Sequence, residues 1–202
     1  MNENFSRTFI FIGRSGCGKG TQAELLKKYL EENDADKRPI FYLETGEQFR
    51  KLLSGDSYAS RLAREVGERG ELQPEFLAVA MWSEELLAKM TGGEHLIIDG
   101  SPRRLREAMV LDSAMSFFRR KSPVIVNIEV SKEWSRARLN GRKRRDDINE
   151  EEVEKRLAWF DTDVRPAIDW FRSGPSYGVV DINGEQTIEE VHREILKKIF
   201  NV

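Results

Sequence analysis

A glycine-rich loop near the start of the chain has the residues needed to bind phosphate groups. Residues 13–21 read Gly-Arg-Ser-Gly-Cys-Gly-Lys-Gly-Thr and follow the strand-like run Thr8–Ile12. Glycines let the backbone fold around an anion with its N–H groups inward, and a helix predicted over Gln22–Leu30 directs its positive end to the same point. Lys19 supplies an ammonium for the terminal phosphates, and the Thr21 hydroxyl can reach Mg²⁺. This is the Walker A pattern; the alternative is an ordinary glycine-rich turn.

A second group of residues combines an acid with a stiff turn. The run Leu96–Ile98 predicts a buried strand, and residues 99–103 continue it as Asp-Gly-Ser-Pro-Arg. An acid at the end of such a strand is the Walker B arrangement, in which Asp99 orients waters on Mg²⁺. Gly100 lets a ligand approach the backbone, and the proline stiffens the turn that aims Arg103. The alternative for Asp99 is a cap on the following helix.

A third group follows the predicted strand Ile40–Leu43. It contains Thr45, Gly46 and Arg50. Because open α/β sheets bind ligands at the carboxyl ends of their strands, these residues can meet a second anion there. The alternative is that Thr45 caps a helix and Arg50 is solvated.

A basic segment, Arg136–Asp147, has Arg156 further along the chain. It contains six cations within ten residues, and these repel one another unless anions neutralise them. Arg138 and Arg142 are four residues apart and so share one face of a helix, where the Asp146-Asp147 pair can orient guanidinium groups. Phosphoryl transfer needs fixed positive groups of this kind. The alternatives are a solvated basic face and an RNA-contacting patch.

The composition narrows the function classes. The 202 residues carry a formal net charge of −2, which argues against a dedicated nucleic-acid binder. No apolar stretch is long enough to span a bilayer, and Met1–Arg7 lacks the apolar core of a signal peptide, so we expect no membrane partner and a cytoplasmic protein. The single cysteine, Cys17, excludes an internal disulfide and a structural zinc site. We read it as a small residue in a tight loop, with a redox switch as the alternative.

Short strand-like runs alternate with longer helical patterns, which is typical of a parallel sheet built from βαβ units. Helices are predicted over Glu75–Met90 and Glu150–Phe171, and Thr187 with Glu190 forms a capping box before a final amphipathic helix. The five predicted strands are Thr8–Ile12, Ile40–Leu43, Leu96–Ile98, Val124–Val130 and Val179–Ile182.

The motifs, in their order along the chain, resemble those of the adenylate kinase family of nucleoside monophosphate kinases. They read Gly-x4-Gly-Lys-Gly-Thr-Gln, Thr-Gly-x3-Arg, Asp-Gly-x-Pro-Arg, Arg-Leu-x2-Arg, and Arg-x-Asp-Asp with a downstream Arg. The resemblance implies an α/β fold of the P-loop NTPase type over residues 1–202, with five parallel strands. It also implies a monophosphate-binding arm at 45–74 and a short basic lid at 136–148. The lid lacks the metal ligands of some long lids, so a zinc-free monomer is implied.

The resemblance also implies roles for single residues on the donor side. Mg²⁺ is implied at Thr21 and, partly through water, at Asp99. Arg138 matches the arginine that packs against the donor base. The implied ATP-binding residues are Gly16, Gly18, Lys19, Gly20, Thr21, Arg138 and Arg142. The implied catalytic residues are Lys19, Arg103, Arg142, Arg144 and Arg156.

On the acceptor side, the resemblance implies that Arg50 and Arg103 hold the phosphate of the monophosphate, with Thr45 near its base. No general base is required, because the acceptor phosphate is already ionised. The implied monophosphate-binding residues are Thr45, Arg50, Glu71, Leu72, Gln73, Gly100, Arg103, Glu107, Arg144 and Arg156.

Three positions depart from the family pattern. Glu47 replaces an aspartate, Ser101 replaces an aromatic residue, and Glu107 replaces the glutamine that reads adenine. An ionised carboxylate only accepts hydrogen bonds, so Glu107 matches adenine at one atom and guanine at two, unless it pairs with Arg104 or Arg106 instead. We expect transfer of the ATP γ-phosphoryl group to AMP. The alternatives are GMP, CMP or UMP as acceptor, a nucleoside or other small metabolite as acceptor, and a regulatory module without turnover.

Overall fold

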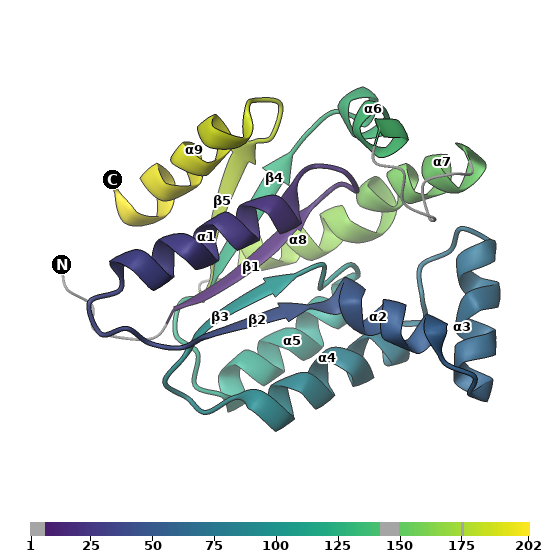
Figure 1. Ribbon diagram of the computed structural model, residues 1–202, viewed down its shortest axis with the longest axis horizontal. Coiled ribbons are helices and arrows are strands. Elements are labelled where there is room, and N and C mark those ends of the chain that lie inside the picture. The colour runs from purple at the N-terminus through teal and green to yellow at the C-terminus, as the bar shows by residue number, and fades with distance from the viewer. Residues whose placement is uncertain (1–6, 142–149, 175) are drawn as a thin grey trace.

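Five parallel strands form the centre of the fold in the computed structural model, which describes residues 7–141, 150–174 and 176–202 (Figure 1). They lie in the order β2-β3-β1-β4-β5. Each predicted strand is confirmed, with its ends within one residue of the prediction. The strands are β1 (Thr8–Gly13), β2 (Ile40–Glu44), β3 (His95–Asp99), β4 (Val124–Glu129) and β5 (Gly178–Asn183).

Helices cover both faces of this sheet, which gives the expected α/β architecture (Figure 1). One face packs against α1 (Lys19–Asn33) and α9 (Ile188–Phe200). The other packs against α4 (Glu75–Lys89), α5 (Leu105–Phe117) and α8 (Arg165–Ser173). Within the described residues, no helix is both long and apolar enough to cross a membrane.

The central strand β1 is buried along its whole length. Phe9 and Phe11 pack into the core beneath α1 and α9, whereas Ile10 and Ile12 pack into the core on the other face. Successive side chains of a strand point to opposite faces, so a strand covered on both faces must be apolar throughout. This strand fixes the position of the glycine-rich loop that follows it.

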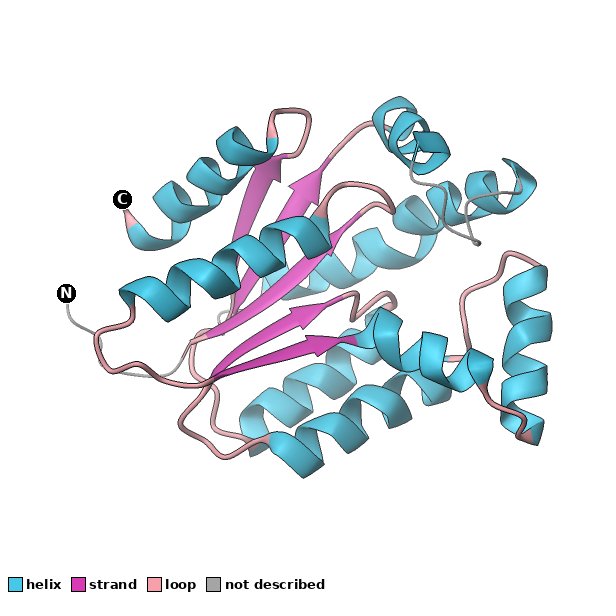
Figure 2. Cartoon of the chain, in the orientation of Figure 1, coloured by secondary structure: helices cyan, strands magenta, loops and turns pink. Residues whose placement is uncertain are grey.

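Two groups of helices lie beyond the carboxyl ends of the strands (Figure 2). On one side, α2 (Thr45–Ser54) and α3 (Tyr58–Glu68) make up most of the segment 45–74. On the other side lie α6 (Lys132–Gly141) and α7 (Glu150–Trp159). Both groups therefore lie at the carboxyl edge of the sheet, where open α/β sheets bind their ligands.

The single helix predicted over Glu150–Phe171 is wrong in its middle. A π-helical turn, η2 (Phe160–Val164), separates α7 from α8, and α8 ends at Ser173. Pro166 lies at the start of α8 and has no N–H to donate to the carbonyl four residues earlier, so the regular helical ladder cannot pass through it.

A buried histidine begins strand β3. His95 Nδ1 accepts a hydrogen bond from the backbone N–H of Arg7 at 3.0 Å, and its Nε2 lies 3.5 Å from Asp34 Oδ2. Burial lowers the pKa of His95, although the nearby Asp34 carboxylate opposes this shift. The imidazole ring of His95 is therefore neutral in the folded protein at neutral pH.

The free energy of unfolding should fall as the pH drops below the ordinary histidine pKa of 6.5. The unfolded chain binds a proton at that pH, whereas folded His95 binds one only at lower pH. Burial lowers the pKa of His192 in the same direction. Urea unfolding at pH 7.5 and 5.5 measures the loss, which should be smaller in His95→Asn; an unchanged loss in that variant would contradict the assignment to His95.

Candidate active site

The glycine-rich loop joins β1 to α1 in a conformation that only glycines adopt easily. Gly16 and Gly18 have φ of 84° and 97°, in the left-handed region, and Gly18 is the N-cap of α1. The ammonium of Lys19 donates to the carbonyl oxygens of Gly13, at 3.0 Å, and Arg14, at 3.2 Å. The loop thus presents a helix N-terminus and a cation at one point, which suits an anion.

Asp99, the acid predicted to lie beside the glycine-rich loop, contacts the end of that loop. Asp99 ends β3, is 8% exposed, and accepts a hydrogen bond from the Tyr42 hydroxyl at 3.3 Å. A Cβ atom on Gly20 would lie 3.1 Å from Asp99 Oδ2, so glycine is what allows the carboxylate to approach the first turn of α1. Burial raises the pKa of Asp99, whereas the charge of Lys19 opposes this rise.

These residues suit a metal ion that arrives with its nucleotide. The carboxylate of Asp99 faces the turn of α1 that carries Thr21, whose side chain is exposed. Among the described residues, no group of three or more His, Cys, Asp or Glu side chains is arranged to hold a metal ion by itself.

The turn after β3 meets the start of α2. Gly100 has φ of 90°, and a Cβ atom there would lie 3.8 Å from Arg103 Nη2 and 3.9 Å from the backbone nitrogen of Gly46. Arg103 Nε donates to the carbonyl oxygen of Gly100 at 3.0 Å. The Thr45 hydroxyl oxygen is buried without a hydrogen-bond partner among the described residues. Gly46, Thr45, Gly100 and Arg103 therefore lie close together where α2 begins beside this turn.

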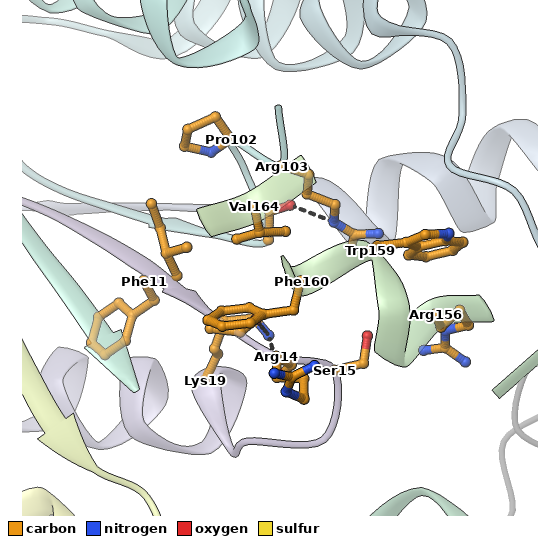
Figure 3. A pocket seen from close by; sticks show the side chains of 13 residues that line it. Phe11, Arg14, Ser15, Lys19, Pro102, Arg103, Arg156, Trp159, Phe160 and Val164 are labelled. Carbon is orange, nitrogen blue, oxygen red and sulfur yellow. Dashed lines mark hydrogen bonds between the residues drawn. The ribbon is translucent and has the colours of Figure 1, made fainter. Parts of the chain in front are cut away.

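Three predicted cations lie around a single cleft at this edge of the sheet. Figure 3 shows Lys19 from the loop, Arg103 from the turn after β3 and Arg156 from α7 on its walls. Gly100 also lines the cleft. Residues more than 50 positions apart in the sequence are thus brought together, as in-line transfer between two phosphates requires.

Arg14, which no motif in the sequence singled out, connects the loop to the helix that carries Arg156. Its Nη1 donates to the carbonyl oxygen of Leu157 at 2.6 Å and to Asp161 Oδ2 at 3.0 Å. The guanidinium also lies over the ring of Phe160, with its carbon 4.5 Å from the ring centroid. Trp159, another residue of the cleft that was missed, lies almost one helical turn after Arg156. That spacing was the available signal.

Several predicted site residues lie elsewhere or are not described. Arg138 belongs to α6, where its guanidinium carbon lies 5.7 Å from the ring centroid of Trp134. Arg142 and Arg144 lie outside the described residues. Near the end of the arm, Glu71 pairs with Arg69 at 3.1 Å, and Leu72 is half-buried.

The end of the arm is attached to the turn after β3. Arg104 Nη1 donates to the carbonyl oxygen of Gln73 at 3.0 Å, and Arg104 Nε donates to Asp163 at 3.2 Å. The side chain of Gln73 donates to the carbonyl oxygen of Ala63 at 2.8 Å. The carbonyl oxygen and the side-chain amide of Gln73, which were expected near the acceptor base, therefore already form hydrogen bonds within the protein.

Glu107 has two partners within the protein. Its Oε1 accepts from Trp82 Nε1 at 3.2 Å, and its Oε2 accepts from the backbone N–H of Arg103 at 2.7 Å. The residue is 3% exposed, and neither bond goes to the side chain of Arg104 or Arg106. Contact between Glu107 and the acceptor base stays a prediction. The base would have to compete with these two donors for the carboxylate oxygens.

Glu107→Gln should lower the free energy of unfolding by about 1–3 kcal/mol, because the amide NH₂ cannot accept and one buried donor loses its partner. Urea unfolding measures the change. Glu84→Gln, which alters an exposed acid on α4, is the matched control. If Glu107→Gln is as stable as the control, the two hydrogen bonds are not what fixes this glutamate.

Together, the parallel sheet and the glycine-rich loop at its carboxyl edge define a protein of the P-loop fold class. The family model described as adenylate kinase matches residues 11–175, and the chain belongs to this family. The adenylate kinase of Desulforamulus reducens is 29% identical, covering 93% of this chain and 97% of that protein. Adenylate kinase 1 of a Nostoc species is 31% identical, with 92% and 95% covered. The adenylate kinase of Leptospira biflexa is 30% identical, with 96% and 100% covered.

Proposed function

We propose that this protein transfers the γ-phosphoryl group of ATP to AMP, which yields two ADP. The observation that carries the proposal is the convergence of Lys19, Arg103 and Arg156 on one cleft at the carboxyl edge of the sheet. Family membership supports the same reaction, because the relatives are named adenylate kinases.

In the proposed reaction, an ionised oxygen of the acceptor phosphate attacks the γ-phosphorus, and the bond to the β–γ bridging oxygen breaks. The electron pair stays on ADP, so no side chain has to remove a proton. Gly16, Gly18 and Gly20 let the loop backbone surround the donor phosphates, and Lys19 stabilises charge on the transferring group. Arg103 holds the acceptor phosphate, and Arg156 faces both phosphates from α7.

The metal in this proposal is Mg²⁺, held by Thr21 and, through water, by Asp99. When bound, it neutralises charge on the β- and γ-phosphate oxygens. We also propose that segment 45–74 closes over the monophosphate, in a zinc-free, cytoplasmic monomer. Thr45 and the backbone of 71–73 then lie close to the acceptor base. Of the short basic lid expected at 136–148, residues 142–148 lie outside the described residues.

Side-by-side transfer assays test the proposal directly. ATP and Mg²⁺ are supplied with AMP, GMP, CMP, UMP or dTMP, and with adenosine as an acceptor that lacks phosphate. We expect the highest kcat/KM with AMP and no transfer to adenosine. Preference for another monophosphate would replace the acceptor, transfer to adenosine would overturn the phosphate-binding role of Arg103, and no turnover would favour a regulatory module.

A further inference from the structure

A carboxylate that the proposed reaction does not use lies near the turn that carries Gly100 and Arg103. Glu44 is the last residue of β2, and its Oε1 accepts a hydrogen bond from Arg50 Nη2 at 2.7 Å. Arg50 is the residue expected to hold the acceptor phosphate. The side chains of Glu44 and Arg50 are 32% and 56% exposed, so the pair is open to exchange with a ligand.

The position of this pair places it at the phosphate side of the acceptor site. A Cβ atom on Gly46 would lie 3.2 Å from Arg50 Nη1 and 3.6 Å from Glu44 Oε1. The backbone nitrogen of Gly46 in turn borders Gly100, next to the guanidinium of Arg103. The carboxylate of Glu44 therefore contacts one arginine, Arg50, whose helix begins beside the turn that carries the other, Arg103.

A second acid makes this edge more negative. Glu44 is the register partner of Asp99 in the neighbouring strand, so the two acids end adjacent strands. A dianionic phosphate that binds to Arg50 must therefore compete with the carboxylate of Glu44, which already accepts a hydrogen bond from that guanidinium.

We propose that Glu44 acts as an internal substitute for the acceptor phosphate, which rests on the proposed function. The Glu44 carboxylate holds Arg50 until a monophosphate displaces it, so Glu44 weakens acceptor binding. An acceptor without a phosphate cannot displace a carboxylate from a guanidinium, so Glu44 also disfavours nucleosides. Glu44 is thus a specificity-determining residue for phosphorylated acceptors.

Glu44→Ala and Glu44→Gln should each lower the calorimetric Kd for AMP by about three- to fivefold, the scale on which an exposed ion pair competes. The Kd for ATP should not change. Glu47→Gln is the matched control, since Glu47 lies on α2, the helix that carries Arg50, and pairs with Lys51 at 3.0 Å. Unchanged or weaker AMP binding in both Glu44 variants would overturn the proposal, because Glu44 would then merely orient Arg50.

A double-mutant cycle separates competition from general repulsion. In an Arg50→Ala background, Glu44→Ala should change the Kd for AMP by less than half of its effect in the wild-type background. A gain that persists in full would overturn competition for Arg50. The proposed function fails separately: if the wild-type protein binds and phosphorylates no monophosphate, both proposals fall, whereas AMP turnover with unresponsive Glu44 variants removes only this one.

Discussion

Lys19→Met is expected to reduce turnover about 10³-fold or more and to leave the fold nearly intact. The substitution removes the ammonium group that donates to the carbonyl oxygens of Gly13 and Arg14. A charge held at the transferring phosphoryl group stabilises the transition state more than the bound substrates, so the loss appears mainly in kcat.

Initial rates with ATP and AMP measure this loss, and circular dichroism with urea unfolding tests the fold. Lys27→Met is the control, because Lys27 lies on the same helix and only approaches Glu31, at 4.0 Å. A folded Lys19→Met protein that keeps more than a tenth of wild-type turnover would refute the phosphate-loop assignment.

The parts of the fold that the sequence predicted depend on short-range patterns. The run that became β1 is apolar on both faces, and the Thr187–Glu190 capping box forms at the start of α9, with both of its hydrogen bonds. Such signals lie within a few residues of one another. Pro166 is a local signal for the interruption around Phe160–Val164, whereas the contacts of Asp161 and Phe160 with Arg14, well over a hundred residues away in the sequence, have no such signal.

The same distinction separates the site residues. The positions of Lys19, Asp99 and Arg103 at the carboxyl edge of the sheet could be predicted, because strand ends and glycines mark where a parallel sheet meets its ligands. The partners of Glu44 and Glu107 could not, since each depends on which side chain from another segment reaches the carboxylate. The sequence therefore shows which charged group is present at a position, whereas the structure shows which hydrogen-bond partners within the protein that group already has.

Arg103→Ala should weaken the binding of AMP about ten- to hundredfold and leave ATP binding nearly unchanged. A guanidinium contact with a phosphate is worth roughly 1.5–3 kcal/mol, and this loss acts only on the ligand that Arg103 holds. The backbone N–H of Arg103 still donates to Glu107 in the variant, so the start of α5 keeps that hydrogen bond.

Calorimetry with AMP and with ATP, each alone, resolves the two sides of the cleft. Arg106→Ala is the control for the loss of a positive charge, because Arg106 is exposed on α5 three residues further on. Arg103→Lys should recover part of the AMP affinity, since the charge remains but the two-pronged contact is lost. If Arg103→Ala weakened only the binding of ATP, Arg103 would belong to the donor side. The acceptor phosphate would then have to bind without the turn after β3.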